Sequence, residues 1–201
     1  MCNRYEANIE RLRKIFPNAP LGWFEKIDLK YDSFYPRSIV PLIKSQDGSG
    51  LTYDNFQWGI FPPWAKKKSD IQTNSRSETI LEKPTFRNSF LHRRCLLPAT
   101  AFYEPVKGHR AQVKFEIEGE EYFCFAGIWD FSFIDGERIP TCSILTTEPN
   151  EVVGEVHPRM PVIIPREQCR PYLQAPANAA EKLLELLRPY PPDEMKGTLI
   201  E

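Results

Sequence analysis

The sequence has little of what metal centres, membrane proteins and strongly basic DNA-binding proteins require. It contains three histidines and five cysteines, and no two cysteines form a Cys-x-x-Cys pair. The spacing of a zinc ribbon is therefore absent. No run of about 18 apolar residues is present, so no transmembrane helix is expected. The formal net charge is −1, so a nucleic-acid partner would need a local basic surface. We expect no metal, no cofactor and no contact with membranes.

The amino-terminal segment is polar and has no apolar core of the kind found in signal peptides. We therefore expect the protein in the cytoplasm, associated with the nucleoid. The number of cysteines is odd and four of the five lie in apolar contexts, which indicates reduced, buried thiols. Nothing in the sequence demands a dimer, and a monomer is expected.

Composition indicates a single globular domain that spans residues 1–201. Hydrophobic residues make up 41% and charged residues 26% of the chain, which is typical of a globular protein. Nineteen prolines favour strands and loops over long helices. No repeat and no linker divides the chain. The expected fold class is mostly β (α+β), with short peripheral helices.

Periodicity and turn signals predict the main elements. Helical spacing is present in residues 4–16 and 178–187, whereas residues 78–92 are mixed, with helical spacing at Phe86 and Phe90 around a break at Pro84. Residues 30–43 are irregular or extended, residues 46–50 form a loop tip, and residues 51–60 and 161–164 are strands. Two hairpins are predicted: residues 112–117 with 122–129 around a turn at 118–120, and residues 131–134 with 140–147 around Asp135-Gly136. The Asp-Gly pair is a strong signal for a type I′ turn.

Cys2 is the first candidate for chemistry. The initiator methionine is usually removed when a small residue follows it, and removal of Met1 would leave an amine and a thiol on one residue. Their ordinary pKa values, about 7.7–8.0 and 8.5, leave both partly nucleophilic near neutral pH. The amine can form a Schiff base with an aldehyde, and the thiol can then close a thiazolidine ring. From its position alone, the alternative is that Cys2 has no role in function.

Four further side chains are candidates for proton transfer or substrate binding. His157 precedes a proline and titrates near neutral pH, although a polar loop histidine is the alternative. Glu104 has apolar and aromatic neighbours that would raise its pKa, although an exposed glutamate is the alternative. Asn74 lies in a polar loop, where it could hydrogen-bond a substrate while Arg76 holds a phosphate, although a loop in which Ser75 or Ser77 simply caps a helix is the alternative.

Residues 58–68 interleave large aromatic side chains with lysines, a composition that suits single-stranded nucleic acid. We expect Trp58 in the core. Trp64, Lys66 and Lys67 follow the stiff Pro62-Pro63 pair and are expected on the surface, where Trp64 would stack on a base. Core aromatic residues beside a solvated lysine run are the alternative.

Seven blocks in order resemble the SOS-response-associated peptidase family, whose members are abasic-site processing proteins. These blocks are residues 1–5, 58–64, 74–79, 94–105, 125–130, 144–150 and 157–161. The family pattern has glycine where this chain has Asn3 and tryptophan where it has Pro105. The resemblance implies a curved, barrel-like antiparallel sheet with a concave face that binds single-stranded DNA.

The resemblance also implies roles for individual residues. Cys2 forms a covalent thiazolidine crosslink with the ring-opened aldehyde of an abasic site and so shields the lesion. Asn74 positions the linkage, and Glu104 and His157 assist proton transfer, with His157 as the acid that helps open the sugar. The implied phosphate contacts are Arg4, Arg76 and Arg159.

Two other functions remain open from the sequence. Cys2, His157 and Glu104 could form a thiol-based peptidase that removes Met1 autocatalytically, with lyase-type activity as a further possibility. A plain single-strand binding module would bind DNA without using Cys2 at all.

Overall fold

The computed structural model describes residues 2–25, 32–46 and 50–200. The strands are β1 (Tyr5–Glu6), β2 (Ser33–Phe34), β3 (Ile39–Gln46), β4 (Gly50–Trp58), β5 (Asn74–Arg76), β6 (Arg94–Ala99), β7 (Ala101–Pro105), β8 (Gln112–Ile117), β9 (Phe123–Ile134), β10 (Glu137–Thr147), β11 (Met160–Pro161), β12 (Ile163–Ile164) and β13 (Met195–Ile200). The helices are α1 (Ile9–Ile15), α2 (Leu21–Glu25), α3 (Pro84–His92), α4 (Glu151–Gly154), α5 (Cys169–Gln174) and α6 (Ala180–Leu183).

A closed barrel forms the centre of the molecule. Its strands follow the order β10-β4-β3-β6-β9, and β9 pairs with β10 to close the ring. The expected curved, barrel-like sheet is thus confirmed, but it is mixed, because β10 runs parallel to β4 and β5. The barrel interior is tight. A Cβ atom on Gly127 of β9 would lie 2.5 Å from a methyl group of Leu97.

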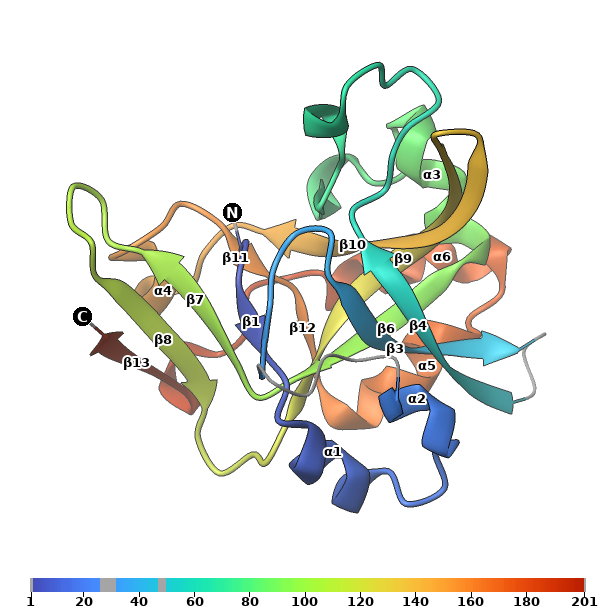
Figure 1. The fold of residues 1–201 in the computed structure, drawn as a ribbon. Coiled ribbons are helices and arrows are strands. Elements are labelled where there is room, and N and C mark those ends of the chain that lie inside the picture. The colour runs from blue at the N-terminus through green and yellow to red at the C-terminus, as the bar shows by residue number, and fades with distance from the viewer. Residues whose placement is uncertain (1, 26–31, 47–49, 201) are drawn as a thin grey trace.

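A second, antiparallel sheet lies beside the barrel and has the order β13-β8-β7-β1-β2 (Figure 1). Strand β7 directly follows barrel strand β6, so the two sheets are joined through one short connection. The Tyr5 ring, which is fully buried, packs against Trp58 and Phe125 of the barrel at centroid distances of 5.4 and 5.5 Å. This aromatic cluster fixes the orientation of β1, and therefore of the chain just before it.

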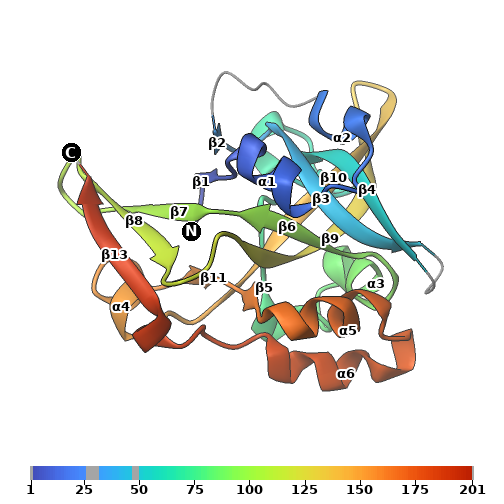
Figure 2. The same ribbon diagram turned by 90° about the horizontal axis from the view of Figure 1, so that it is seen from below.

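Short helices cover the barrel on opposite sides, with α1 and α2 on one side and α5 and α6 on the other (Figure 2). Trp23 of α2 anchors its helix by donating a hydrogen bond to the Asp54 carbonyl at 3.1 Å. In the part of the chain that the structure describes, no helix is long and apolar enough to cross a membrane.

The Asp135-Gly136 hairpin is confirmed. Residues 134 and 137 pair across it, and Asp135 and Gly136 both have positive φ, 52° and 84°. A type I′ turn requires this pair of conformations. The strand predicted over residues 51–60 is also confirmed, as β4.

Other predictions of local structure are corrected. The hairpin around residues 118–120 is wrong in its pairing, since β8 lies between β7 and β13 while β9 lies in the barrel. The turn there leads from one sheet to the other. The helix predicted over residues 4–16 begins only at Ile9, because Tyr5 and Glu6 pair with β2 and β7. The helix predicted over residues 178–187 is broken into α and 3₁₀ turns, and residues 47–49 of the predicted loop tip lie outside the described part.

Candidate active site

Cys2 lies just before β1, where the second sheet meets the barrel. The amide of Tyr103 on β7 donates to the Arg4 carbonyl at 3.0 Å, which ties this end of the chain to β7. The Cys2 side chain is fully buried, and its thiol lies 3.6 Å from the Arg4 carbonyl oxygen. Burial, followed by the nearby charge of Glu104, raises the pKa of the thiol well above its ordinary value. This burial favours the neutral thiol at neutral pH, whereas the sequence predicts a partly ionised one once Met1 is removed.

Asn74 reaches Cys2 from the barrel. Strand β5 pairs in parallel with β10 and places Asn74 opposite Ile144. The Asn74 amide nitrogen donates to the Cys2 carbonyl oxygen at 3.1 Å and to the Thr73 hydroxyl at 3.1 Å. Its amide oxygen is buried and has no hydrogen-bond partner among the described residues. An unpaired buried acceptor is costly, and this one lies on the side chain that holds the backbone of Cys2.

Glu104 and His157 meet between the two sheets. Glu104 is fully buried on β7, and its Oε2 lies 3.8 Å from His157 Nδ1. Burial raises the pKa of Glu104 to about 7, so the carboxyl is about half protonated at neutral pH. Burial also lowers the pKa of His157, which keeps its imidazole neutral there. A half-protonated acid beside a neutral imidazole can exchange a proton near pH 7.

The loop that carries His157 is held from both ends. Asn150 caps α4 by accepting from the Val153 amide at 2.9 Å, and it donates to the Tyr190 carbonyl at 2.8 Å. At the other end, His157 Nδ1 lies 2.9 Å from the Arg159 carbonyl oxygen and 3.1 Å from the Arg159 amide nitrogen. The first contact suits a proton on Nδ1, and the second suits a proton on Nε2. Both tautomers are thus accommodated.

Arg159 itself makes two parallel bonds to the carboxylate of Glu78, and the Nη2–Oε2 distance is 2.9 Å. Its Nη2 also donates to the Thr146 carbonyl at 2.7 Å. The hydrogen bond from Arg159 lowers the pKa of Glu78, so this pair remains ionised at neutral pH. The guanidinium, expected to contact phosphate, is therefore bound within the protein.

A cavity of about 420 Å³ opens beside Asn74. Trp64 lies on its rim with 58% of its surface exposed, and Arg76 is exposed. The expected burial of Trp58 and exposure of Trp64 are both confirmed. The sequence prediction missed five lining residues that chain order scatters around Trp64, Asn74 and Arg76: Gln72, Thr79, Lys83, Thr85 and Phe86.

The remaining predicted basic contacts differ in their surroundings. The side chains of Lys66 and Lys67 are exposed, while their backbone amides donate to Asp70 at 2.9 and 3.0 Å. Arg4 is half-buried on the second sheet, with its guanidinium 4.0 Å from the Tyr103 ring centroid and 2.7 Å from the Gln112 side-chain oxygen. Arg4 is therefore engaged within its sheet.

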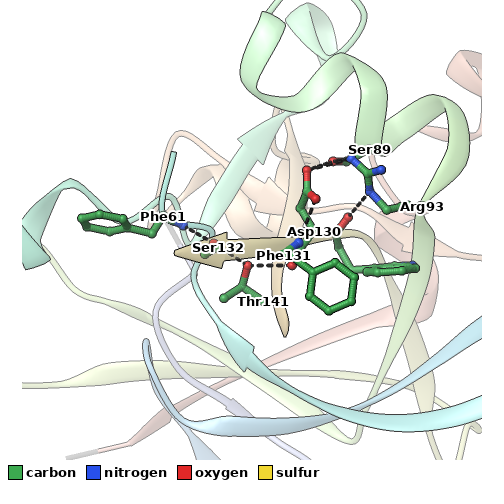
Figure 3. A network of polar contacts seen from close by, with 8 residues as sticks. Phe61, Ser89, Arg93, Asp130, Phe131, Ser132 and Thr141 are labelled. Atoms are coloured by element: carbon green, nitrogen blue, oxygen red, sulfur yellow. Dashed lines mark hydrogen bonds and ion pairs between the residues drawn. The ribbon is translucent and has the colours of Figure 1, made fainter. Parts of the chain in front are cut away.

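A polar network joins β9 to two segments that contribute residues to this cavity, namely α3 and the segment around Trp64 (Figure 3). Asp130 accepts from Arg93 at 2.8 Å and from Ser89 at 2.9 Å, which joins β9 to α3. Ser132 accepts from the Phe61 amide at 2.9 Å, which joins β9 to the segment that leads to Trp64. Because these bonds converge on β9, they hold α3 and the Trp64 segment in fixed relation.

The model of the SOS response associated peptidase (SRAP) family matches residues 1–201. The chain belongs to this family. Among relatives of this SRAP protein, Abasic site processing protein YoaM of Bacillus subtilis is 36% identical over 183 residues, with 83% of this chain and 81% of YoaM covered. Abasic site processing protein HMCES of Rattus norvegicus is 28% identical over 197 residues, and the match covers 77% of this chain and 56% of HMCES.

A solved structure shares the SRAP fold along the whole chain. It is a protein from Bacteroides thetaiotaomicron with 25% identity and a TM-score of 0.82, and the match covers 100% of this chain and 92% of that one. Within the described residues of this SRAP protein, no group of three or more histidine, cysteine, aspartate or glutamate side chains could hold a metal ion.

Proposed function

We propose that this protein processes abasic sites in single-stranded DNA by forming a covalent thiazolidine with Cys2, after removal of Met1. One observation carries the proposal: Asn74 of the barrel donates a hydrogen bond to the Cys2 carbonyl, while the buried Glu104, whose charge helps to raise the pKa of the Cys2 thiol, lies 3.8 Å from His157. The names of the relatives supply the substrate class, an abasic site.

Opening of the sugar requires a proton at its ring oxygen. We assign this step to His157, with Glu104 as the reservoir that supplies and takes back the proton. The separation of 3.8 Å between Oε2 and Nδ1 is long for a hydrogen bond, but such distances tighten when substrate binds. A neutral imidazole can accept at one nitrogen while it donates from the other, so it can relay a proton.

The covalent steps then follow at the exposed aldehyde. The Cys2 amine adds to the aldehyde carbon, and the carbinolamine loses one water to give a Schiff base. The Cys2 sulfur adds to the same carbon, and the proton that the thiol releases passes by way of Glu104 to the nitrogen. The balance is one aldehyde plus one aminothiol giving one thiazolidine and one water. Because burial keeps the thiol neutral, we place attack by the amine first.

Asn74 would fix the geometry of ring closure. Its amide nitrogen holds the Cys2 carbonyl, and its buried oxygen is placed to accept a hydrogen bond from a bound ligand. Trp64 would stack on a base at the cavity rim. Phosphates would contact Arg76, Lys66 and Lys67. Arg4 and Arg159 are bound to other groups of the protein, so only their remaining N–H groups would be available to a phosphate.

Intact mass spectrometry tests the linkage. Mature protein and an oligonucleotide with one abasic site should give an adduct lighter than their sum by one water, with Met1 absent. Borohydride should leave this mass unchanged, because it adds two hydrogens to a Schiff base and none to a thiazolidine. An adduct that gains two hydrogens, or no adduct, would refute the thiazolidine.

The peptidase in the family name is the second candidate, since a thiol, an imidazole and a carboxyl also make a hydrolytic site. The raised pKa of the Cys2 thiol disfavours a thiolate nucleophile. Retention of Met1 in His157→Ala, with its loss from the native chain, would favour this candidate instead.

A further inference from the structure

The outer face of β9 carries a row of aromatic side chains away from the Cys2 site. Trp129, Phe131 and Phe133 alternate along the strand and therefore point to the same side. Phe131 is 39% exposed and Phe133 is 68% exposed, while Trp129 is half-buried and packs edge-on against Phe131 at 5.7 Å. Two exposed phenylalanine rings in one row are unusual on a soluble surface and point to a partner.

Cationic side chains lie over these rings. The Arg138 guanidinium lies 3.6 Å from the centroid of Phe131, and Arg138 is directly opposite Phe133 in the β9–β10 register. Lys44 lies over Trp129 at 5.4 Å, but its ammonium is paired with Asp54 at 3.1 Å, so Arg138 provides the positive charge next to the exposed rings. Aromatic faces flanked by positive charge suit nucleobases linked by phosphates better than an apolar protein segment.

This row is continuous with the cavity beside Asn74. A second hollow of about 190 Å³ is lined by Phe131, Phe133 and Thr85, among others. Thr85 also lines the first cavity, and Trp64 donates to its hydroxyl at 3.4 Å. The Trp64–Thr85 contact is thus a shared rim. A single strand of DNA that passes over the Trp64–Thr85 contact would leave the cavity beside Asn74 and reach the two phenylalanine rings.

Hydrogen bonds also tie this surface to neighbouring segments. The hydrogen bonds of Asp130 and Ser132, shown in Figure 3, alternate along β9 with the aromatic row and tie it to α3 and the Trp64 segment. The charge of Asp130, which would repel phosphate, is paired with Arg93 at 2.8 Å. A preorganised surface loses little entropy when it binds.

We infer that the outer face of β9 is a second binding surface for single-stranded DNA, on which undamaged bases stack beyond the lesion cavity. Phe133 supplies the open stacking face, and Phe131 supports Arg138, whose guanidinium lies over the Phe131 ring and supplies both a planar stack and a phosphate contact. This inference rests on the proposed function, since it extends the path of the DNA strand that carries the abasic site.

Fluorescence anisotropy with a labelled oligothymidine that carries no abasic site tests the inference. Phe131→Ala/Phe133→Ala should bind about tenfold more weakly than the native chain, and the loss should shrink for an oligonucleotide too short to leave the cavity. Phe131→Tyr/Phe133→Tyr keeps the aromatic faces and should restore the affinity. Leu199→Ala is the matched control, because Leu199 is 62% exposed on β13 of the other sheet.

The two claims fail separately. If native protein crosslinks abasic DNA but the alanine pair binds intact DNA as the native chain does, the β9 surface is refuted and the crosslink stands. If the alanine pair binds weakly but native protein forms no crosslink, the surface stands and the covalent function is refuted. An equal loss in Leu199→Ala, or no recovery in the tyrosine pair, would overturn base stacking as the cause.

Discussion

Asn74 and Cys2 are 72 residues apart in the chain, and the side chain of the first donates to the carbonyl of the second at 3.1 Å. The residues next to Asn74 and Cys2 in the sequence do not by themselves bring the two side chains together. Asn74 is positioned by the parallel pairing of β5 with β10, and Cys2 by the attachment of the first strand to β7. The bond therefore joins the two sheets at the point where we place the reaction.

Asn74→Ala should slow crosslinking by about tenfold to a hundredfold, because positioning of reacting groups contributes at this scale. It should change affinity for intact single-stranded DNA much less, since Trp64 and Arg76 remain. Single-turnover rates at saturating protein, beside anisotropy, separate the two effects. Equal losses in rate and affinity would assign Asn74 to DNA binding instead.

Glu104→Gln should stabilise the protein at alkaline pH. The folded state holds the Glu104 proton more tightly than the unfolded chain, with a pKa of about 7 against 4.5. Stability from this group is therefore complete below about pH 4.5 and is lost as pH rises through about 7. The variant should gain up to about 3 kcal/mol at pH 8 and nothing near pH 4.

Urea denaturation at both pH values measures this difference. Glu137→Gln removes an exposed carboxylate on β10 and serves as the control. A pH-independent difference between Glu104→Gln and the native chain would contradict the assigned pKa. In crosslinking, the same variant should lose any inflection of the rate near pH 7.

Glu78→Ala should slow crosslinking by about tenfold, although Glu78 touches no reacting group. Arg159 would lose its carboxylate, and the backbone of Arg159 holds His157 Nδ1. Glu78→Gln keeps one acceptor and should recover part of the rate. Glu82→Ala, an exposed acid nearby, is the control. If Arg159 mainly serves DNA, Glu78→Ala would instead raise DNA affinity at an unchanged crosslinking rate.

Trp64→Ala should weaken binding of single-stranded DNA about tenfold, since one base stack is worth about 1–3 kcal/mol. Its stability should change by about 0.5 kcal/mol or less, because Trp64 is mostly exposed. Anisotropy and thermal unfolding check the two parts. Loss of stability together with affinity would show that Trp64 supports the fold rather than the ligand.

Local signals in the sequence predicted local structure well. The Asp135-Gly136 turn and strand β4 depend on neighbouring residues, and both are confirmed. The turn at residues 118–120 looks the same in sequence, but the pairing of β8 and β9 is decided by distant strands. The wrong prediction there has the same origin as the missed lining residues of the cavity beside Asn74, because both depend on how distant segments pack together.

The candidate site shows the same division. Residue types and the family pattern predicted roles for Cys2, Asn74, Glu104 and His157, which the fold brings together, but they did not predict the full burial of Glu104 that raises its pKa. Nor did they indicate that Arg159 is bound to Glu78. The sequence also did not predict that Phe133 is exposed, because the alternation of side chains along a strand does not show which face of the strand meets solvent.

The most direct test of the account is a denaturing gel of mature protein with single-stranded DNA that carries one abasic site, for the native chain and Cys2→Ala. Both keep an amino-terminal amine, but only the native chain has the thiol that closes the ring. The account predicts a heat-stable shifted band for the native chain without reductant, and a band for Cys2→Ala only after borohydride trapping. No band for the native chain, with Met1 shown absent, or an equally heat-stable band for untreated Cys2→Ala, would contradict it.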